Sequence, residues 1–219
     1  MRFIGFILTM SISLFLAVPQ VLAQPTVSDV MVTDVTPRAF SVVWTADEPS
    51  TGQLEVFSDP NGLSPVSVTK VNRSQSNPPA QELGVLKIDV TGLSANTTYY
   101  LRTVTTAKGG GGATLYPASP PLLSVSTQTR VTRTVMVGPN ESPFTNDQLA
   151  VDVFQEDGVT PADGALVLLN VAGAGHPVSA FVGEGAASPR AILDMNNLFD
   201  AAAHSSLDLF GGEGGAVTV

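Results

Sequence analysis

The sequence predicts an all-β protein of two tandem β-sandwiches, with seven strands in the first. Three observations support this prediction. Short runs alternate apolar and polar residues, turn-forming residues recur roughly every dozen positions, and no long stretch has the period of an amphipathic helix. The chain also contains 20 glycines and 16 prolines, which favours strands joined by tight turns over a helical bundle.

Residues 1–23 are predicted to form a secretory signal peptide. Arg2 precedes an apolar run that extends to Val18, and a small-residue ending predicts cleavage after Ala23. A transmembrane anchor is the alternative, but the run is shorter than the roughly 20 apolar residues that span a bilayer. It is interrupted by Thr9, Ser11 and Ser13. We therefore expect a secreted protein, extracellular or periplasmic, without membrane contact after cleavage.

The charge of the chain restricts its partners. The net charge is −9, and its distribution is uneven: residues 24–128 hold six basic and eight acidic side chains, whereas residues 129–219 hold three and eleven. Such a surface repels nucleic acid and anionic membranes, so neither is an expected partner. No cysteine is present, so packing without disulfides must stabilise the fold. A protein or glycan ligand and the oligomeric state stay open, and a ligand held by charge is expected on the second domain.

Residues 24–128 are predicted to form the first domain. Phe40, Val42 and Trp44 share one face of a strand, so Trp44 is expected in the core. The polar loop 72–81 contains Pro78-Pro79, a pair that argues against regular structure. The strands expected here are 27–35, 38–46, 54–57, 66–71, 86–90, 99–104 and 122–127, with a flexible hairpin tip at 109–112.

A tyrosine corner is predicted at 92–99, because Leu93 stands six residues before the strand-opening Tyr99. In such a corner the tyrosine ring fills the core beside the leucine. Its hydroxyl binds a backbone group a few residues upstream, a bond worth about 1 kcal/mol net. A plain edge-strand tyrosine is the alternative. Beyond the corner, Leu101 is expected to face the core and Tyr100 the opposite side.

Residues 25–128 resemble a fibronectin type III domain. The resemblance lies in Pro25, Trp44, Leu93 and Tyr99, and in a span of about 100 residues typical of such a sandwich. The usual Pro-Gly of the corner is replaced by Ala95-Asn96, and asparagine accepts the same turn geometry. The resemblance implies a seven-stranded Greek key that serves as a binding or spacer module. It carries no catalytic residues, and the integrin-binding Arg-Gly-Asp tripeptide is absent.

Residues 129–219 are predicted to form a second β-sandwich. The nearly continuous apolar run 165–171 is typical of a strand buried on both faces, and 196–203 favours a helical turn or two. The other strands expected are 130–137, 148–154, 178–182, 190–195 and 214–219, the last of which either completes the sheet or marks a truncated piece. Asp157-Gly158-Val159-Thr160-Pro161 and Gly164-Ala165-Leu166-Val167 resemble segments of bacterial immunoglobulin-like and carboxypeptidase-regulatory-like sandwiches.

No set of residues predicts catalysis or a cofactor. His176 and His204 are isolated in loops and expected to face solvent, which leaves too few ligands for zinc. Ser179 lacks the frame of a nucleophile elbow, and Gly109–Gly112 lies between strands, where it presents no helix terminus to phosphate. We therefore expect that the chain is not an enzyme and binds no cofactor.

Acidic residues offer two further candidate sites. Calcium candidates flank one turn and are Glu156, Asp157 and Asp163; a solvated charged loop is the alternative. The best pair for glycoside hydrolysis is Asp152 and Asp194. Acceptor triplets for N-glycosylation begin at Asn72, Asn96 and Asn140, which a bacterial secreted chain would leave unmodified.

The sequence thus predicts a secreted, non-enzymatic modular protein that acts in adhesion, binding or spacing at the cell surface. Two alternatives remain. The chain is the accessory module of a larger extracellular hydrolase whose catalytic domain lies beyond Val219, or it is a carbohydrate-binding module that uses Tyr100 and Tyr116 as an aromatic pair.

Overall fold

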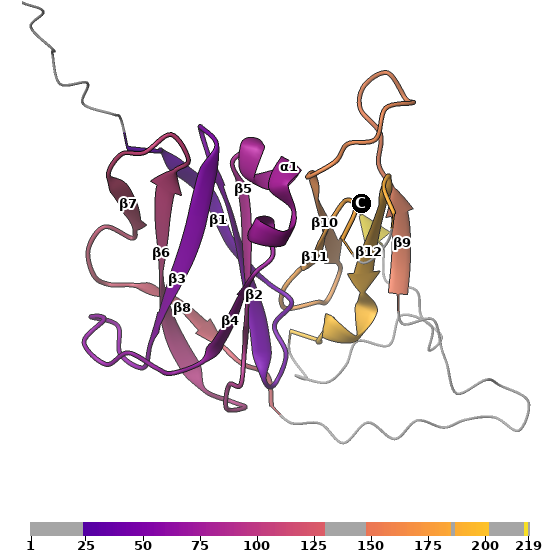
Figure 1. Ribbon diagram of the computed structural model, residues 1–219. Helices are drawn as coiled ribbons and strands as arrows, with labels where there is room; N and C mark the ends of the chain where they lie inside the picture. The colour runs from indigo at the N-terminus through magenta and orange to yellow at the C-terminus, as the bar shows by residue number, and fades with distance from the viewer. Residues whose placement is uncertain (1–23, 130–147, 185–186, 202–216, 219) are drawn as a thin grey trace, which may run out of the picture.

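The computed structural model describes residues 24–129, 148–184, 187–201 and 217–218 (Figure 1). These residues form several antiparallel sheets with almost no helix, which confirms the all-β prediction. Predictions for the signal peptide, the strand at 130–137, Asn140 and His204 lie outside the described residues. Within the described residues, no helix has the length and apolar character needed to cross a membrane.

The N-terminal part comprises eight strands in two four-stranded sheets. One sheet has the order β1-β2-β5-β4, and the other has the order β3-β6-β7, with β8 also paired to β6. The strands are β1 (Val27–Thr33), β2 (Ala39–Ala46), β3 (Ser50–Phe57), β4 (Thr69–Asn72), β5 (Val85–Thr91), β6 (Thr98–Ala107), β7 (Ala113–Tyr116) and β8 (Leu123–Ser126).

Both sheets contribute side chains to a single hydrophobic cluster around Trp44, which is 1% exposed. Its indole Nε1 donates to the buried Thr105 Oγ1 at 2.9 Å, so the one polar atom of the ring is satisfied. A Cβ at Gly52 would lie 2.4 Å from Trp44 Cζ2. The glycine is therefore required for the large ring to fit between the sheets.

The tyrosine hydroxyl bond that the spacing predicts is present. Ser94 N donates to Tyr99 Oη at 2.9 Å, and Leu93 is 3% exposed. The Tyr99 ring packs against Phe40 with ring centroids 6.4 Å apart. Asn96 has φ +50°, the left-handed conformation that asparagine tolerates in place of glycine. The predicted alternation of β6 is also confirmed, because buried and half-buried side chains alternate along it from Tyr99 to Ala107.

Pro78-Pro79 does not prevent regular structure, so this prediction is wrong. The segment forms η1 (Ser74–Ser76) and α1 (Pro78–Glu82). The prolines occupy the first turn of α1, where their missing N–H groups have no intrahelical acceptor and their fixed φ suits the helix. The strand expected at 66–71 also starts later, at Thr69, because Pro65 and Val66 bond instead to the end of β3.

β7 and β8 share one edge of β6. The β6 residues Thr103–Thr106 pair with β7 and Thr98–Leu101 with β8. The glycine-rich tip joins β6 to β7 as expected, but β7 itself was not predicted. The interruption between β7 and β8 contains Pro117, Pro120 and Pro121, which cannot donate to a strand ladder. These residues limit pairing along this edge.

The C-terminal part has its own hydrophobic cluster between two small groups of strands, β11-β10-β13 and β12-β9. Its elements are β9 (Gln148–Asp152), β10 (Leu166–Val171), β11 (Val178–Phe181), β12 (Arg190–Asp194), η2 (Met195–Asn197) and β13 (Val217–Thr218). β13 pairs with β10, as expected of a strand that completes the sheet.

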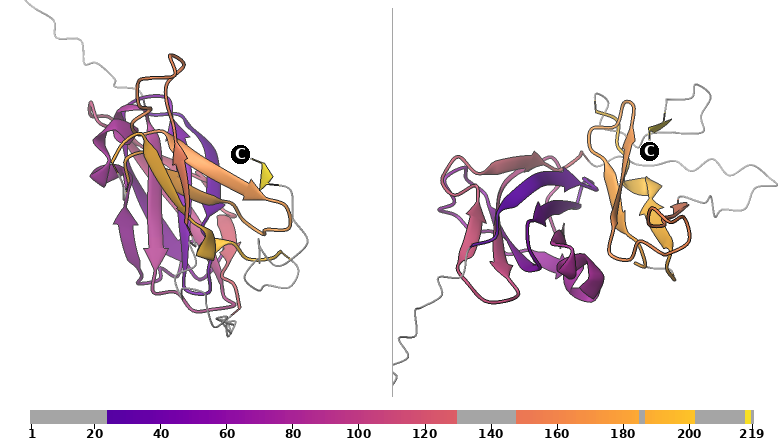
Figure 2. Two further views of the ribbon diagram at one scale, coloured as in Figure 1. Left: turned by 90° about the vertical axis from the view of Figure 1, so that its right-hand side faces the viewer. Right: turned by 90° about the horizontal axis from the view of Figure 1, so that it is seen from above.

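Two predictions for the C-terminal part are wrong. β10 is mostly half-buried, with Asn170 exposed, whereas all four residues of β11 are buried. The reason is that β11 lies between the C-terminal cluster and the N-terminal part, which lie side by side in the right-hand view of Figure 2. The helix expected at 196–203 is only η2, because Leu198 is already extended and Asp200 bridges to Ala174.

We expect Tyr99→Phe to lower the free energy of unfolding by about 1 kcal/mol, because Ser94 N loses its acceptor. Tyr100→Phe is the matched control, since this hydroxyl has no hydrogen bond within the described residues and lies on the opposite face. Urea denaturation of the two variants checks the prediction. Equal effects at the two positions would contradict this assignment of the faces of β6.

Candidate functional site

The most distinctive polar site is the interface between the two parts. Alternate residues of β2 and β5 point away from the N-terminal core, and the register pairs Ser41 with Asp89 and Val43 with Lys87. Ser41, Val43 and Lys87 are nevertheless at most 6% exposed. They are buried because β11 covers this outer face, with Ser179 among the residues in contact.

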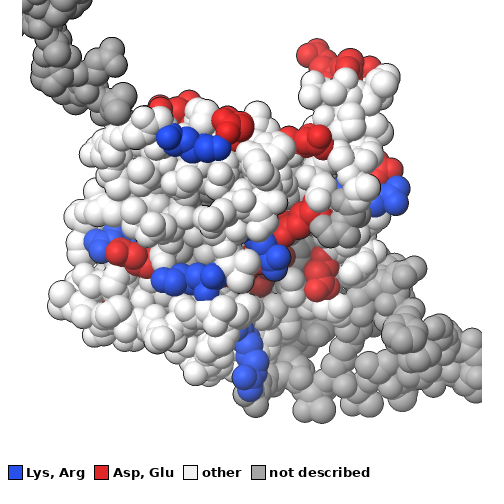
Figure 3. Space-filling model, in the orientation of Figure 1, with Lys and Arg blue, Asp and Glu red and all other residues white. Residues whose placement is uncertain are grey.

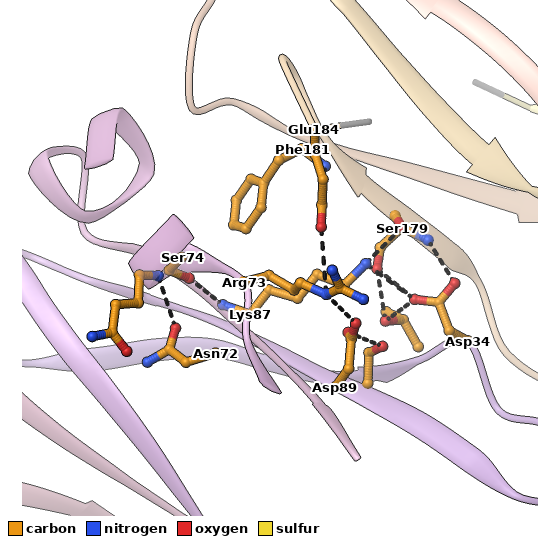
Figure 4. A network of polar contacts seen from close by, with 12 residues as sticks. Asp34, Asn72, Arg73, Ser74, Lys87, Asp89, Ser179, Phe181 and Glu184 are labelled. Atoms are coloured by element: carbon orange, nitrogen blue, oxygen red, sulfur yellow. Dashed lines mark hydrogen bonds and ion pairs between the residues drawn. The ribbon is translucent and has the colours of Figure 1, made fainter. Parts of the chain in front are cut away.

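Asp34, Lys87 and Ser179 form the centre of this interface (Figure 4). Lys87 Nζ donates to the backbone oxygen of Ser179 at 2.8 Å and lies 3.6 Å from Asp34 Oδ2. Ser179 Oγ donates to Asp34 Oδ2 at 2.6 Å, and Ser179 N donates to Asp34 Oδ1 at 3.2 Å. Thr33 Oγ1 also donates to Asp34 Oδ2 at 2.8 Å. One carboxylate therefore receives donors from both parts.

The backbone at Asp34 is shaped for this contact. Asp34 follows directly after β1 and has φ +55°, a left-handed conformation that aspartate adopts more readily than most residues. Its N–H donates to Pro177 O at 2.9 Å. The same residue thus bonds to the C-terminal part through both its backbone and its side chain, which offsets the cost of the unfavourable φ.

A second charged group lies beside the first. Arg73 Nε is 2.5 Å from Asp89 Oδ2 and 3.5 Å from Glu184 Oε1, so it joins two carboxylates from the two parts. The hydrogen bond with Asp89 raises the pKa of Arg73, which stays protonated. Ser41 Oγ donates to the other oxygen of Asp89 at 2.7 Å. Figure 3 shows basic and acidic side chains next to each other where the parts meet.

Close packing near α1 extends the interface. Asn77 Nδ2 donates to Val182 O at 3.3 Å. Gly164, with φ +81°, comes so close to α1 that a Cβ there would lie 2.4 Å from Ala80 N. Phe181 is fully buried yet belongs to the core cluster of neither part. The interface therefore combines an apolar contact with the polar network.

A serine, a lysine and an aspartate together, as in Ser179, Lys87 and Asp34, suggest nucleophilic catalysis, but the geometry of these three residues does not support it. Lys87 bonds to the carbonyl oxygen of Ser179 and not to its hydroxyl. The side chains of Lys87 and Asp34 are 7% and 8% exposed, and Ser179 is 5% exposed. A nucleophile needs an activating base and access to substrate. This arrangement joins two pieces of protein instead.

The three calcium candidates are not brought together. The Asp157 carboxylate accepts from Val159 N at 2.9 Å and from Thr160 N at 2.8 Å, and these bonds hold the turn. The hydrogen bond from the Thr160 hydroxyl is the largest cause that lowers the pKa of Asp157, and the two backbone bonds lower it further. Asp163 accepts from Ser188 Oγ, and Glu156 is exposed. Among the described residues, no group of three or more histidine or acidic side chains is placed to hold a metal ion.

Asp152 and Asp194 lie at opposite ends of the β9–β12 pair. Asp152 faces Arg190 across the strands and forms a bidentate ion pair with it at 2.7 and 2.9 Å, whereas Asp194 lies opposite Gln148 and caps η2. A four-residue separation along a strand is about 13 Å. Glycosidase carboxylates lie about 5 to 9.5 Å apart, so this pair does not match.

The aromatic pair proposed for carbohydrate binding is also separated. Tyr116 lies opposite Thr103, whose side chain is fully buried, so Tyr116 is on the inner side of the sheet. Tyr100 points to the outer side. Because directly paired residues point to the same face, the two rings cannot form one flat platform.

The remaining single residues have local explanations. His176 is half-buried beside the interface, so the prediction that it faces solvent is wrong. Burial lowers its pKa, against a smaller opposite effect of a hydrogen bond with the Val32 backbone. Asn72 donates to Gly52 O at 2.7 Å, while Asn96 is exposed in its turn.

Sequence reasoning missed Asp34, Arg73, Lys87 and Asp89. Ser41, Lys87 and Asp89 alternate with apolar residues, a pattern typical of a solvated strand face. The only signal to the contrary was Val43, an apolar residue on that face.

No protein-family model matches the chain, and a search of curated proteins finds no match either. What the protein does must therefore be inferred from its own residues.

We expect Lys87→Met to lower the free energy of unfolding by about 3 to 5 kcal/mol, because it leaves the buried Asp34 carboxylate without its counter-charge. Adding Asp34→Asn should recover part of this loss. The control is Arg190→Met, which breaks an exposed pair and should change stability little. Chemical denaturation checks the series, and equal losses for Lys87→Met and Arg190→Met would contradict it.

We expect His176 to make the protein less stable as the pH falls below about 6.5, the ordinary histidine value. Its folded-state pKa is lowered, so the unfolded chain takes up the proton first and protonation favours unfolding. Above that pH, His176 is neutral in both states and adds no dependence. Denaturation between pH 7.5 and 5.5 should show a smaller loss in His176→Gln, and an identical loss in the two proteins would contradict the assignment.

Proposed function

We propose that the protein is a secreted, non-enzymatic modular protein of two tandem β-sandwiches that acts in adhesion, binding or spacing at the cell surface. The observation that carries the proposal is the buried polar interface, which fixes one part against the other. A spacer or presenting module sets the position of what it carries only when its modules do not pivot. Neighbouring domains normally move relative to each other unless their interface is extensive.

The strand pairing supports the sandwich architecture. In the N-terminal part, β1, β2, β5 and β4 face β3, β6 and the β7–β8 edge, with one cluster between them. This grouping is the one used by immunoglobulin-type sandwiches, to which fibronectin type III domains are related in architecture. The resemblance of residues 25–128 to a fibronectin type III domain is thus compatible with the order of the strands.

The directions of the interface bonds support a fixed orientation. Cross-interface partners in the N-terminal part come from the end of β1, from β5 and from the segment around η1. Among them are Thr33, Asp34, Lys87, Arg73 and Asn77. Contacts at three separate points restrain rotation as well as separation. The polar groups also require a defined geometry, because a shift would leave buried charges unpaired.

We expect the two parts of the wild-type chain to tumble as one body in ¹⁵N NMR relaxation. Ser179→Asp should separate them, because it places a second carboxylate against Asp34 while the side chain at 179 lies in neither core. The C-terminal part should then reorient faster, with both cores still folded. Ser124→Asp, the same substitution at an exposed strand position, should leave the relaxation unchanged.

Two outcomes would overturn the proposal. Independent tumbling of the two parts in the wild-type chain would remove the fixed orientation. Turnover of ester, glycoside or phosphate substrates that disappears on a point mutation would remove the non-enzymatic role.

A further inference from the structure

A polar groove opens between the two sheets of the N-terminal part, where the edge strands β3 and β4 lie side by side (Figure 1). Its volume is about 460 Å³, within the range of small-ligand sites in proteins. None of the residues that line it takes part in the cross-interface bonds. The groove is therefore a second site, distinct from the interface.

The buried Gln81 indicates that the groove is built to bind something. Gln81 is 7% exposed, and its side-chain amide makes no hydrogen bond within the described residues. No fully enclosed side-chain polar atom in the described structure lacks a partner, so the amide remains accessible from the groove that it lines. Solvent in the groove can therefore hydrogen bond to this amide, which has no partner within the described residues. A ligand that hydrogen bonds to Gln81 would take the place of that solvent.

The other groups in the groove are mainly hydrogen-bond donors. Asn72 Nδ2 and Lys70 Nζ donate to the carbonyl oxygens of Gly52 and Leu54, at 2.7 and 2.9 Å. These two β3 residues thus direct their backbone groups into the groove, where their N–H groups are about 7 Å apart. Lys70 has two further N–H bonds to offer. No carboxylate lines the groove.

This set of groups defines the ligand by elimination. A cation or an amine lacks a carboxylate to bind, and an apolar ligand finds only Leu54 and Ile88, which belong to the core. An ammonium and backbone donors match a carboxylate. The amides of Gln53, Gln75 and Gln81 both donate and accept, which matches hydroxyl groups.

We propose that this groove binds a carboxylated sugar, with Lys70 on the carboxylate and the amide of Gln81 on a hydroxyl group. The inference rests on the proposed non-enzymatic binding role and adds a ligand class to it. It does not depend on the aromatic pair Tyr100 and Tyr116, which lies on opposite sides of the sheet. An acidic glycan at a cell surface supplies such a group at many positions.

Calorimetric titration of the full chain with trigalacturonic acid tests the proposal. The matched probes are its methyl ester, which removes the charge, and triglutamate, which keeps carboxylates without sugar hydroxyls. We expect binding of trigalacturonic acid alone. Gln81→Met should weaken it about tenfold without loss of stability, since the amide makes no internal bond. Lys70→Met should weaken it at least as much, and Lys70→Arg should retain it.

Two controls separate this proposal from the previous one. Arg38→Met removes an exposed positive charge outside the groove and should leave binding unchanged. Ser179→Asp should bind the sugar normally even where it releases the interface. Absence of trigalacturonate binding, equal binding of its ester or of triglutamate, or unchanged affinity in Gln81→Met would each overturn the carboxylated-sugar site. These results would leave the fixed orientation of the two parts untouched.

Discussion

The contact between Asp34, Lys87 and Ser179 is the constraint on which the arrangement of the two parts depends. The lysine and aspartate side chains are at most 8% exposed, and their charged atoms are 3.6 Å apart. Removing two charges from water costs several kcal/mol each, and mutual attraction offsets this only with well-placed additional hydrogen bonds. Those bonds come from Ser179 and Thr33, that is, from both sides of the interface. Burial of these charges on docking is therefore tolerable because both parts supply hydrogen bonds to them.

This requirement explains several features that are otherwise unrelated. β11 is buried on both faces because one face supplies the C-terminal core and the other covers β2 and β5. Asp34 has a left-handed backbone, and in this conformation its N–H and its carboxylate both bond to the C-terminal part. Gly164 lacks a side chain where its loop meets α1. Each feature is local, but its cause is the contact between the two parts.

The N-terminal sheets use their polar residues in two different ways. At the interface, no fully enclosed polar side-chain atom of the described residues lacks a partner, as suits a contact that must not move. At the β3–β4 edge, Lys70 and Asn72 occupy the carbonyl oxygens of the edge strand, which limits pairing with another chain. The side-chain amide of Gln81 behind them has no partner in the described part of the chain. The first arrangement is suited to holding the molecule together and the second to receiving a ligand.

The sequence by itself determined most of the strands and the inner face of the N-terminal part, but not β7 or the start of β4. Trp44, Leu93 and Tyr99 were identifiable because period-two alternation and corner spacing are local patterns that record which side chains face the core.

Local reasoning failed at Pro78-Pro79, where the same residues that break a helix interior begin one. It also failed at the outer face of β2 and β5. Polar residues there look solvated, and Ser179, which contacts Lys87 on this face, lies 92 residues away in the chain. Only the tertiary structure decided that this face is an interface, because alternation shows that a strand has two faces but not what covers the second.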